Sequence, residues 1–123
     1  MQVQQIMRRD FVCAGPDEPL EAARQTMRLA RLRHLLVTRG DALVGILSYR
    51  DLLERGLRAA PDVTRVGDAM RRAPLAVVGP DTPLDEAADC MCRYGYGCLP
   101  VTSAGVLVGL VTETDLLRAA YGL

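Results

Sequence analysis

An internal repeat limits the possible fold of this chain more strongly than any other feature of its sequence. When residues 15–53 are aligned with residues 79–117, which lie 64 positions further along, 16 of the 39 positions are identical. This agreement is far above chance, and a period of this length is typical of two copies of one supersecondary unit. We therefore expect two structural repeats in the 123 residues, 1–60 and 61–123, with 59–62 as the linker.

Hydrophobic spacing predicts the same order of elements in both copies. In the first copy, apolar residues three and four positions apart predict a helix over 20–30, after a short strand at 11–14. Apolar runs at 35–37 and 43–47 flank a Gly-Asp turn and predict a hairpin, and a helix follows from Tyr49 to about Leu57. The matching segments of the second copy are 75–78, 84–94, 98–101, 106–111 and 113–121, and short helical segments at 3–7 and 66–70 precede the two copies.

This order defines the fold class. Each copy is a β-α-β-β-α unit, which places the chain in the mixed α/β (α+β) class. One unit of this size cannot bury both faces of a three-stranded sheet. We therefore expect two units related by a pseudo-twofold axis and packed sheet to sheet.

Composition and charge exclude several classes of partner. Half of the residues are hydrophobic, but there is no tryptophan and one phenylalanine, so the core must be aliphatic. The 15 arginines balance 15 acidic residues, and zero net charge favours neither nucleic acid nor an anionic membrane as partner. No apolar run approaches the roughly 20 residues of a membrane span, and the first residues lack a signal peptide. We therefore expect a cytoplasmic protein whose four cysteines are small buried thiols rather than disulfides or zinc ligands.

The sequence contains no recognisable catalytic constellation. His34 is the only histidine, and no serine or cysteine stands at a familiar spacing from it. Neither a metal-ligand cluster nor a glycine-rich phosphate loop is present. We therefore expect no enzymatic activity and no required cofactor.

One motif, Gly-x-x-Ser/Thr-x-x-Asp, closes the last apolar run of each copy. It ends in Ser48 and Asp51 in the first copy and in Thr112 and Asp115 in the second. A hydroxyl followed three residues later by a carboxylate at a helix start is close to a capping box, which satisfies backbone N–H groups. The same groups suit a ligand, because one carboxylate can accept two hydrogen bonds from a vicinal diol and a helix N-terminus favours phosphate. The two interpretations are compatible.

Further residues recur in both copies around these motifs: Met7 and Met70 in the leading helices, Pro16-Asp17 and Pro80-Asp81 after the first strands, and Ala23/Met27 and Ala87/Met91 in the first long helices. The second copy adds Leu99-Pro100-Val101 in one strand. In their order and duplication, the chain resembles a tandem pair of cystathionine β-synthase (CBS) domains, a Bateman module, over essentially its whole length. The resemblance implies that an adenosine compound, AMP, ADP, ATP or S-adenosylmethionine, binds in clefts between the repeats. In this family the Asp holds the ribose hydroxyls, and the Ser or Thr lies near the ribose or a phosphate.

The resemblance extends the candidate site beyond the motif. Arg33 and His34 stand where some nucleotide-sensing relatives place basic residues towards phosphates, and an ordinary half-buried strand residue is the alternative for His34. Tyr94 and Tyr96 either stack on a base or pack in the core. Aliphatic walls for the base are expected from Val12, Cys13 and Ala14, from Ala76, Val77 and Val78, and from Leu99 and Pro100.

The two copies differ from the family pattern in different ways. Leu36 replaces Pro100 in the first copy, so the first cleft has a different wall. The acidic residue that often follows the middle strand in the family is threonine in both copies, at positions 38 and 102. The second copy matches more closely, and we expect its cleft, with Thr112 and Asp115, to bind more tightly.

These observations predict a small stand-alone regulatory module for energy sensing, which binds an adenine nucleotide and signals to an effector protein. The apolar faces of segments 52–57 and 116–121 predict a homodimer. The alternative is a structural or interaction module with empty clefts, whose dimer surface is its function. A third interpretation is a piece of an enzyme separated from its catalytic domain.

Overall fold

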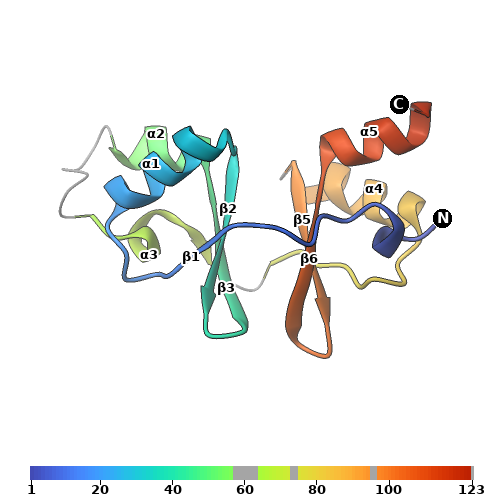
Figure 1. The fold of residues 1–123 in the computed structure, drawn as a ribbon, viewed down its shortest axis with the longest axis horizontal. Helices are drawn as coiled ribbons and strands as arrows, with labels where there is room; N and C mark the ends of the chain where they lie inside the picture. The colour runs from blue at the N-terminus through green and yellow to red at the C-terminus, as the bar shows by residue number, and fades with distance from the viewer. Residues whose placement is uncertain (57–63, 73–74, 95–96, 123) are drawn as a thin grey trace. The chain divides into compact units, whose positions relative to one another are not determined.

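The computed structural model describes residues 1–56, 64–72, 75–94 and 97–122, so the expected linker at 59–62 lies outside the described residues. The chain divides into two compact units, each described here by itself (Figure 1). The central unit comprises Val12–Leu75, and the terminal unit comprises Met1–Phe11 with Ala76–Leu123.

These units are offset from the two sequence repeats. Val3 and Met7, which lead the first repeat, belong to the hydrophobic core of the terminal unit. Val66 and Ala69, which lead the second repeat, belong to the core of the central unit. The leading segment of each repeat therefore completes the core formed by the other repeat.

The central unit is a four-stranded sheet with strand order β1-β2-β3-β4 and three helices. Strand β1 runs parallel to β2, whereas β3 pairs antiparallel with both β2 and β4. The predicted β-α-β-β-α order is confirmed, and β4, with its two arginines, is an addition to it. The elements are β1 (Cys13–Ala14), α1 (Leu20–Ala30), β2 (His34–Arg39), β3 (Ala42–Ser48), α2 (Tyr49–Gly56), α3 (Val66–Ala69) and β4 (Arg71–Arg72).

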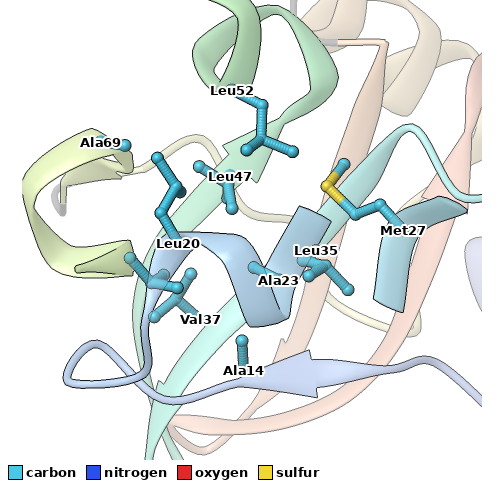
Figure 2. Close-up of a cluster of buried hydrophobic side chains, with 10 residues drawn as sticks. Ala14, Leu20, Ala23, Met27, Leu35, Val37, Leu47, Leu52 and Ala69 are labelled. Carbon is cyan, nitrogen blue, oxygen red and sulfur yellow. The ribbon is translucent and has the colours of Figure 1, made fainter. Parts of the chain in front are cut away.

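The core of the central unit lies between its helices and one face of the sheet (Figure 2). Helix α1 contributes Leu20, Ala23 and Met27, which follow the predicted helical spacing. Strand β2 contributes Leu35 and Val37, which point to the same face because side chains alternate along a strand. The remaining core residues are Ala14, Leu47, Leu52, Val66 and Ala69.

The terminal unit repeats this arrangement with a two-stranded sheet. Isolated bridges from Arg8 to Leu110 and from Val78 to Val101 take the places of β4 and β1. Its core combines the leading segment with the second repeat and includes Val3, Ala87, Met91, Leu99, Val101 and Val111. The elements are the 3-10 helix η1 (Val3–Gln5), α4 (Leu84–Tyr94), β5 (Cys98–Ser103), β6 (Val106–Thr112) and α5 (Glu113–Tyr121).

The strand predicted at 75–78 is shorter in the structure, where it is reduced to one bridge at Val78. In the central unit, Cys13 pairs with Leu36 one position earlier. That pairing requires Leu36 of β2 to donate its backbone N–H to β1. The matching residue of β5 is Pro100, which has no N–H to donate. Val78 keeps the bond that needs no such donor, because its own N–H donates to the Pro100 carbonyl at 3.1 Å.

Candidate functional site

Each Gly-to-Asp segment forms the end of a strand and the start of the following helix, and the predicted capping box is present in both units. Thr112 Oγ1 accepts a hydrogen bond from the Asp115 N–H at 3.2 Å, and the Asp115 carboxylate accepts one from the Thr112 N–H at 2.9 Å. Ser48 and Asp51 make the same two bonds at 3.0 and 2.9 Å. Because one capping bond uses a single acceptor position, each carboxylate keeps capacity for another partner.

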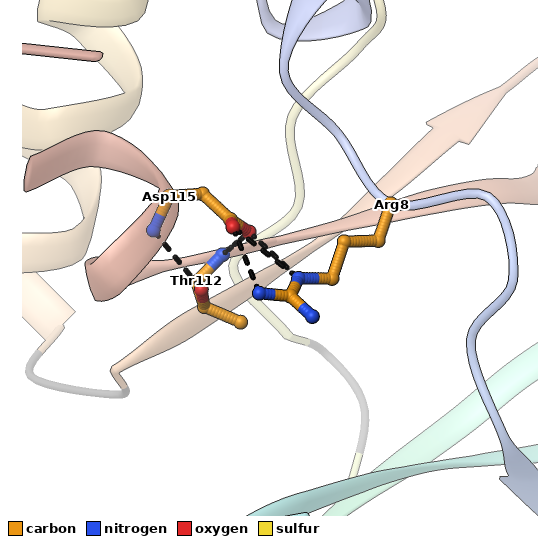
Figure 3. A network of polar contacts seen from close by, with 3 residues as sticks. All are labelled: Arg8, Thr112 and Asp115. Carbon is orange, nitrogen blue, oxygen red and sulfur yellow. Dashed lines mark hydrogen bonds and ion pairs between the residues drawn. The ribbon is translucent and has the colours of Figure 1, made fainter. Parts of the chain in front are cut away.

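In the terminal unit, Arg8 is that partner (Figure 3). Its Nε lies 3.2 and 3.3 Å from the two Asp115 oxygens, and its Nη2 lies 3.1 Å from Oδ1. The Asp115 side chain is 10% exposed and the Arg8 side chain is 49% exposed, so the ion pair lies at the edge of solvent. The hydrogen bond to Asp115 and its negative charge raise the pKa of the Arg8 guanidinium. Together, the cap and Arg8 bring three N–H donors to a carboxylate that has about four acceptor positions, so too few remain for both hydroxyls of a diol.

The backbone of the leading segment places Arg8 beside the motif. Arg8 and Leu110 exchange two backbone hydrogen bonds, of 2.8 and 2.9 Å. The motif glycine makes this approach possible, because a Cβ on Gly109 would lie 2.7 Å from Met7 Sδ and 3.2 Å from the Arg8 carbonyl oxygen. In the central unit Arg71 bridges Ile46 in the same way, and a Cβ on Gly45 would lie 2.9 Å from the Arg71 carbonyl oxygen.

Strand register assigns the predicted site residues to faces of each sheet. Directly paired residues share a face, and so do residues two apart on one strand. We call the face opposite the core the motif face, because Ser48 and Thr112 lie on it. In the central unit it carries Cys13, His34, Leu36, Ile46, Ser48 and Arg71; in the terminal unit it carries Arg8, Cys98, Pro100, Leu110 and Thr112.

The structure brings Arg33 and His34 to the Ser48 motif. His34 is the register partner of Ser48, and the Arg33 carbonyl accepts the Tyr49 N–H at 2.8 Å where α2 begins. Arg33 is exposed and His34 is half-buried. In the terminal unit the matching contact uses Gly97, whose carbonyl accepts the N–H at the start of α5 at 3.0 Å. The central motif therefore has two basic residues at a place where the terminal motif has none.

Other predicted wall residues point into the cores. Ala14, Val78 and Leu99 are buried members of the core clusters, and Ala76 packs against the terminal one. Of Ala14, Val78 and Leu99, the backbone groups are the part available to a ligand, whereas Ala76 is partly exposed. Val12 and Val77 are exposed, Cys13 is exposed on the motif face, and Pro100 is buried there.

The expectation that the cysteines are all buried is wrong. Cys13 and Cys92 are exposed, Cys90 is partly exposed, and Cys98 alone is buried. The expectation of burial follows from the average behaviour of cysteine. In α4, however, the spacing of Cys92 places it away from the buried stripe that contains Ala87 and Met91. Burial, together with the nearby charge of Glu113, raises the pKa of the Cys98 thiol to about 12. Although Cys13 is exposed, partial desolvation by its neighbours raises the pKa of its thiol.

The remaining expectations concern the two tyrosines, metal ligands and a membrane span. Tyr94 is exposed at the end of α4, and Tyr96 lies outside the described residues. Within the described ranges, no group of three or more His, Cys, Asp or Glu side chains could hold a metal ion. No helix in those ranges is long and apolar enough to cross a membrane.

Comparison with known proteins places this geometry in a family. Hypoxic response protein 1 of Mycobacterium tuberculosis (strain ATCC 25618 / H37Rv) is 33% identical over 115 residues, which cover 92% of this chain and 80% of that protein. Inosine-5'-monophosphate dehydrogenase of Korarchaeum cryptofilum (strain OPF8) is 37% identical over 111 residues, covering 88% of this chain and 22% of the dehydrogenase. The chain thus spans about a fifth of the length of that enzyme.

A solved structure agrees with these relatives. The crystal structure of CBSX2 in complex with AMP superposes with a TM-score of 0.86 at 28% identity, over 98% of this chain and 96% of that one. The family model for the CBS domain matches residues 3–58 and again residues 66–122. The chain therefore belongs to the CBS-domain family and contains two copies of the domain.

Proposed function

We propose that this protein is a regulatory CBS-domain pair that binds an adenine nucleotide without catalysis and signals its binding to an effector protein. The observation that carries the proposal is the cluster of Arg8, Thr112 and Asp115 on the motif face. It combines a carboxylate, a hydroxyl at a helix N-terminus and a half-exposed guanidinium. The AMP complex of CBSX2 supports an adenosine ligand, and the candidates are AMP, ADP, ATP and S-adenosylmethionine.

The chemistry of the cluster assigns a role to each group. Asp115 accepts hydrogen bonds from the two ribose hydroxyls, and Thr112 lies beside the N-terminus of α5, where backbone amides and the helix dipole favour a phosphate. A diol that binds through both hydroxyls must displace Arg8 from the carboxylate, because Arg8 and the cap leave too few acceptor positions for two further bonds. The released guanidinium is then able to bind the phosphate, since an arginine fork matches its oxygens.

The central motif is the second binding site in this proposal. Ser48 and Asp51 supply the hydroxyl and the carboxylate, Arg33 supplies positive charge next to them, and His34 adds an imidazole ring. We expect the Thr112–Asp115 site to bind more tightly, because it matches the family pattern more closely.

Asp115→Asn tests whether the carboxylate holds ribose. Loss of a charge-assisted pair of hydrogen bonds should cost roughly 1.5–3 kcal/mol of AMP binding, about a tenfold to hundredfold rise in Kd. Calorimetry measures this effect, and Asp51→Asn is the matched control because it changes the same kind of capping carboxylate. Asp115→Asn and Asp51→Asn should each lower the free energy of unfolding by about 0.5–1 kcal/mol, because each weakens a helix cap. Asp51→Asn should have a smaller effect on the Kd of the tighter Thr112–Asp115 site.

The 2′-deoxy nucleotide separates ribose binding from an indirect effect. On the unmutated protein it should bind more weakly than AMP by a factor similar to that of the mutation. On Asp115→Asn it should show little further loss, because both changes remove the same contact. Fully additive losses would show that Asp115 does not touch the ribose.

A dimerisation module is the second candidate function, and exposed apolar side chains on one helix of each unit favour it. Helices α2 and α5 expose Leu53, Leu117 and Tyr121. Such side chains commonly pair across a twofold axis. We expect a homodimer in sedimentation velocity at tens of micromolar, and Leu53→Arg with Leu117→Arg should convert it to a monomer. Leu29→Arg on α1, which is also exposed, is the control, and a wild-type monomer would exclude the dimer.

A further inference from the structure

The central unit contains a pocket far from the Ser48–Asp51 motif. Its volume is about 450 Å³, within the range of small-molecule sites. Leu43 and Val44, at the first end of β3, contribute apolar surface together with Met70. Ser48 lies at the other end of the same strand, four residues from Val44, or roughly 14 Å along it.

Three arginines give this pocket its chemistry. Arg39, Arg65 and Arg72 line it together with Asp17 and Asp68, so its side chains carry one more positive than negative charge. The one ion pair among them in the described residues joins Arg39 to Asp17 at 3.7 Å, and both side chains are well exposed. An exposed pair at this distance is weak and neutralises little of the positive charge.

Backbone carbonyls position two of the arginines. Arg65 Nη1 donates to the Asp17 carbonyl at 2.5 Å, and Arg72 Nη2 donates to the Gly67 carbonyl at 2.9 Å. Each bond uses one of the five N–H donors of a guanidinium. The groups are therefore held in place and still able to donate to a ligand.

The terminal unit shows that the fold does not need two of these charges, whereas Arg72 has an arginine, Arg9, at its matching position. Arg65 and Gln2 occupy the same position, because Arg65 bridges Pro19 and Gln2 bridges Pro83 at the start of each long helix. Arg39 ends β2, whereas serine ends β5 at the position 64 residues later. In both units the backbone N–H at this position donates to the side chain three residues later, from Arg65 to Asp68 at 3.2 Å and from Gln2 to Gln5 at 2.6 Å. The hairpin also has the same register in both units. Neither feature therefore needs an arginine at these two positions.

We infer that this pocket binds a small phosphorylated polyol, such as a sugar phosphate, independently of the nucleotide site. The arginines match the oxygens of a phosphomonoester, for which a planar fork is better suited than a point charge. The carboxylates of Asp17 and Asp68 accept hydrogen bonds from hydroxyl groups, and the apolar surface contacts the carbon skeleton. A ligand with both phosphate and hydroxyls uses all three kinds of lining.

The residues of the terminal unit provide test substitutions that the fold already accepts. In Arg39→Ser with Arg65→Gln, each arginine is replaced by the residue at the matching position of the other unit. Glucose 6-phosphate is titrated into the 123-residue chain by calorimetry at concentrations up to about 10 mM, a range that covers weak ligands. We expect saturable binding that weakens at least about tenfold in the double variant and weakens as salt is added.

The controls separate this site from other sources of binding. Arg28→Gln on α1 removes one exposed arginine from the same unit and should leave the affinity unchanged. Asp115→Asn should also leave it unchanged, and the double variant should bind AMP normally, so failure of one site does not imply failure of the other. Glucose should not bind, and inorganic phosphate should compete. Absence of saturable binding, equal affinity of the double variant, or equal binding of glucose would overturn the inference.

Discussion

Val3→Asp is expected to unfold the terminal unit, although Val3 is only the third residue of the chain. Val3 is 0% exposed and belongs to the core that includes Leu99 and Val111. A buried carboxylate without a partner costs several kcal/mol, which is a large part of the roughly 5–15 kcal/mol that stabilises a typical domain. Circular dichroism during urea unfolding measures the loss.

Val106→Asp is the matched control for this substitution. Val106 lies in the same unit, at the start of β6, and is 43% exposed. The same chemical change there should alter the unfolding free energy by about 0.5 kcal/mol or less. If the two variants unfolded at the same urea concentration, the leading segment would not be part of the terminal core.

No sequence pattern indicates that the core of the terminal unit depends on the leading segment. Spacing and turn residues predicted α1, the β2–β3 hairpin and α5 correctly, because these signals are local. Val3 and Leu99 belong to one core although 96 positions separate them in the sequence. In a tandem repeat the leading segment fits either copy by pattern alone, since both copies present similar core residues.

The difference between local patterns and long-range contacts also explains which parts of the site were predicted. The pairing of Thr112 with Asp115 was predictable, because both belong to one helix start. Arg8 was not predicted, because 107 positions separate it from Asp115. A signal was present in the repeat, since methionine followed by two arginines stands in both leading segments, at 7–9 and 70–72. Its meaning depends on the bridge between Arg8 and Leu110, which no local pattern indicates.

Arg8→Met is expected to change the preference of the protein between adenosine and AMP. The substitution keeps an apolar chain of similar length and removes the guanidinium from Asp115. Breaking this half-exposed ion pair costs on the order of 1 kcal/mol, which any ribose must overcome in the unmutated protein. Adenosine should therefore bind several-fold more tightly to the variant.

AMP should respond in the opposite direction or gain much less. Its phosphate loses the guanidinium as a partner, and a charge-assisted hydrogen bond contributes roughly 1.5–3 kcal/mol. The ratio of the AMP affinity to the adenosine affinity should thus fall about tenfold or more. Calorimetry with both ligands measures this ratio, and Arg9→Met is the control because it removes the neighbouring exposed arginine.

Each ligand tests a separate part of the mechanism. If adenosine bound equally to the unmutated protein and Arg8→Met, ribose would not compete with Arg8 for Asp115. If both ligands gained the same factor, Arg8 would only block the carboxylate and would not bind the phosphate. The expected pattern, a gain for adenosine with a lower AMP-to-adenosine ratio, requires that Arg8 changes partners when the nucleotide binds. Because Arg8 belongs to the leading segment, that exchange would release its side chain from α5 and supply the conformational signal that a regulatory module needs.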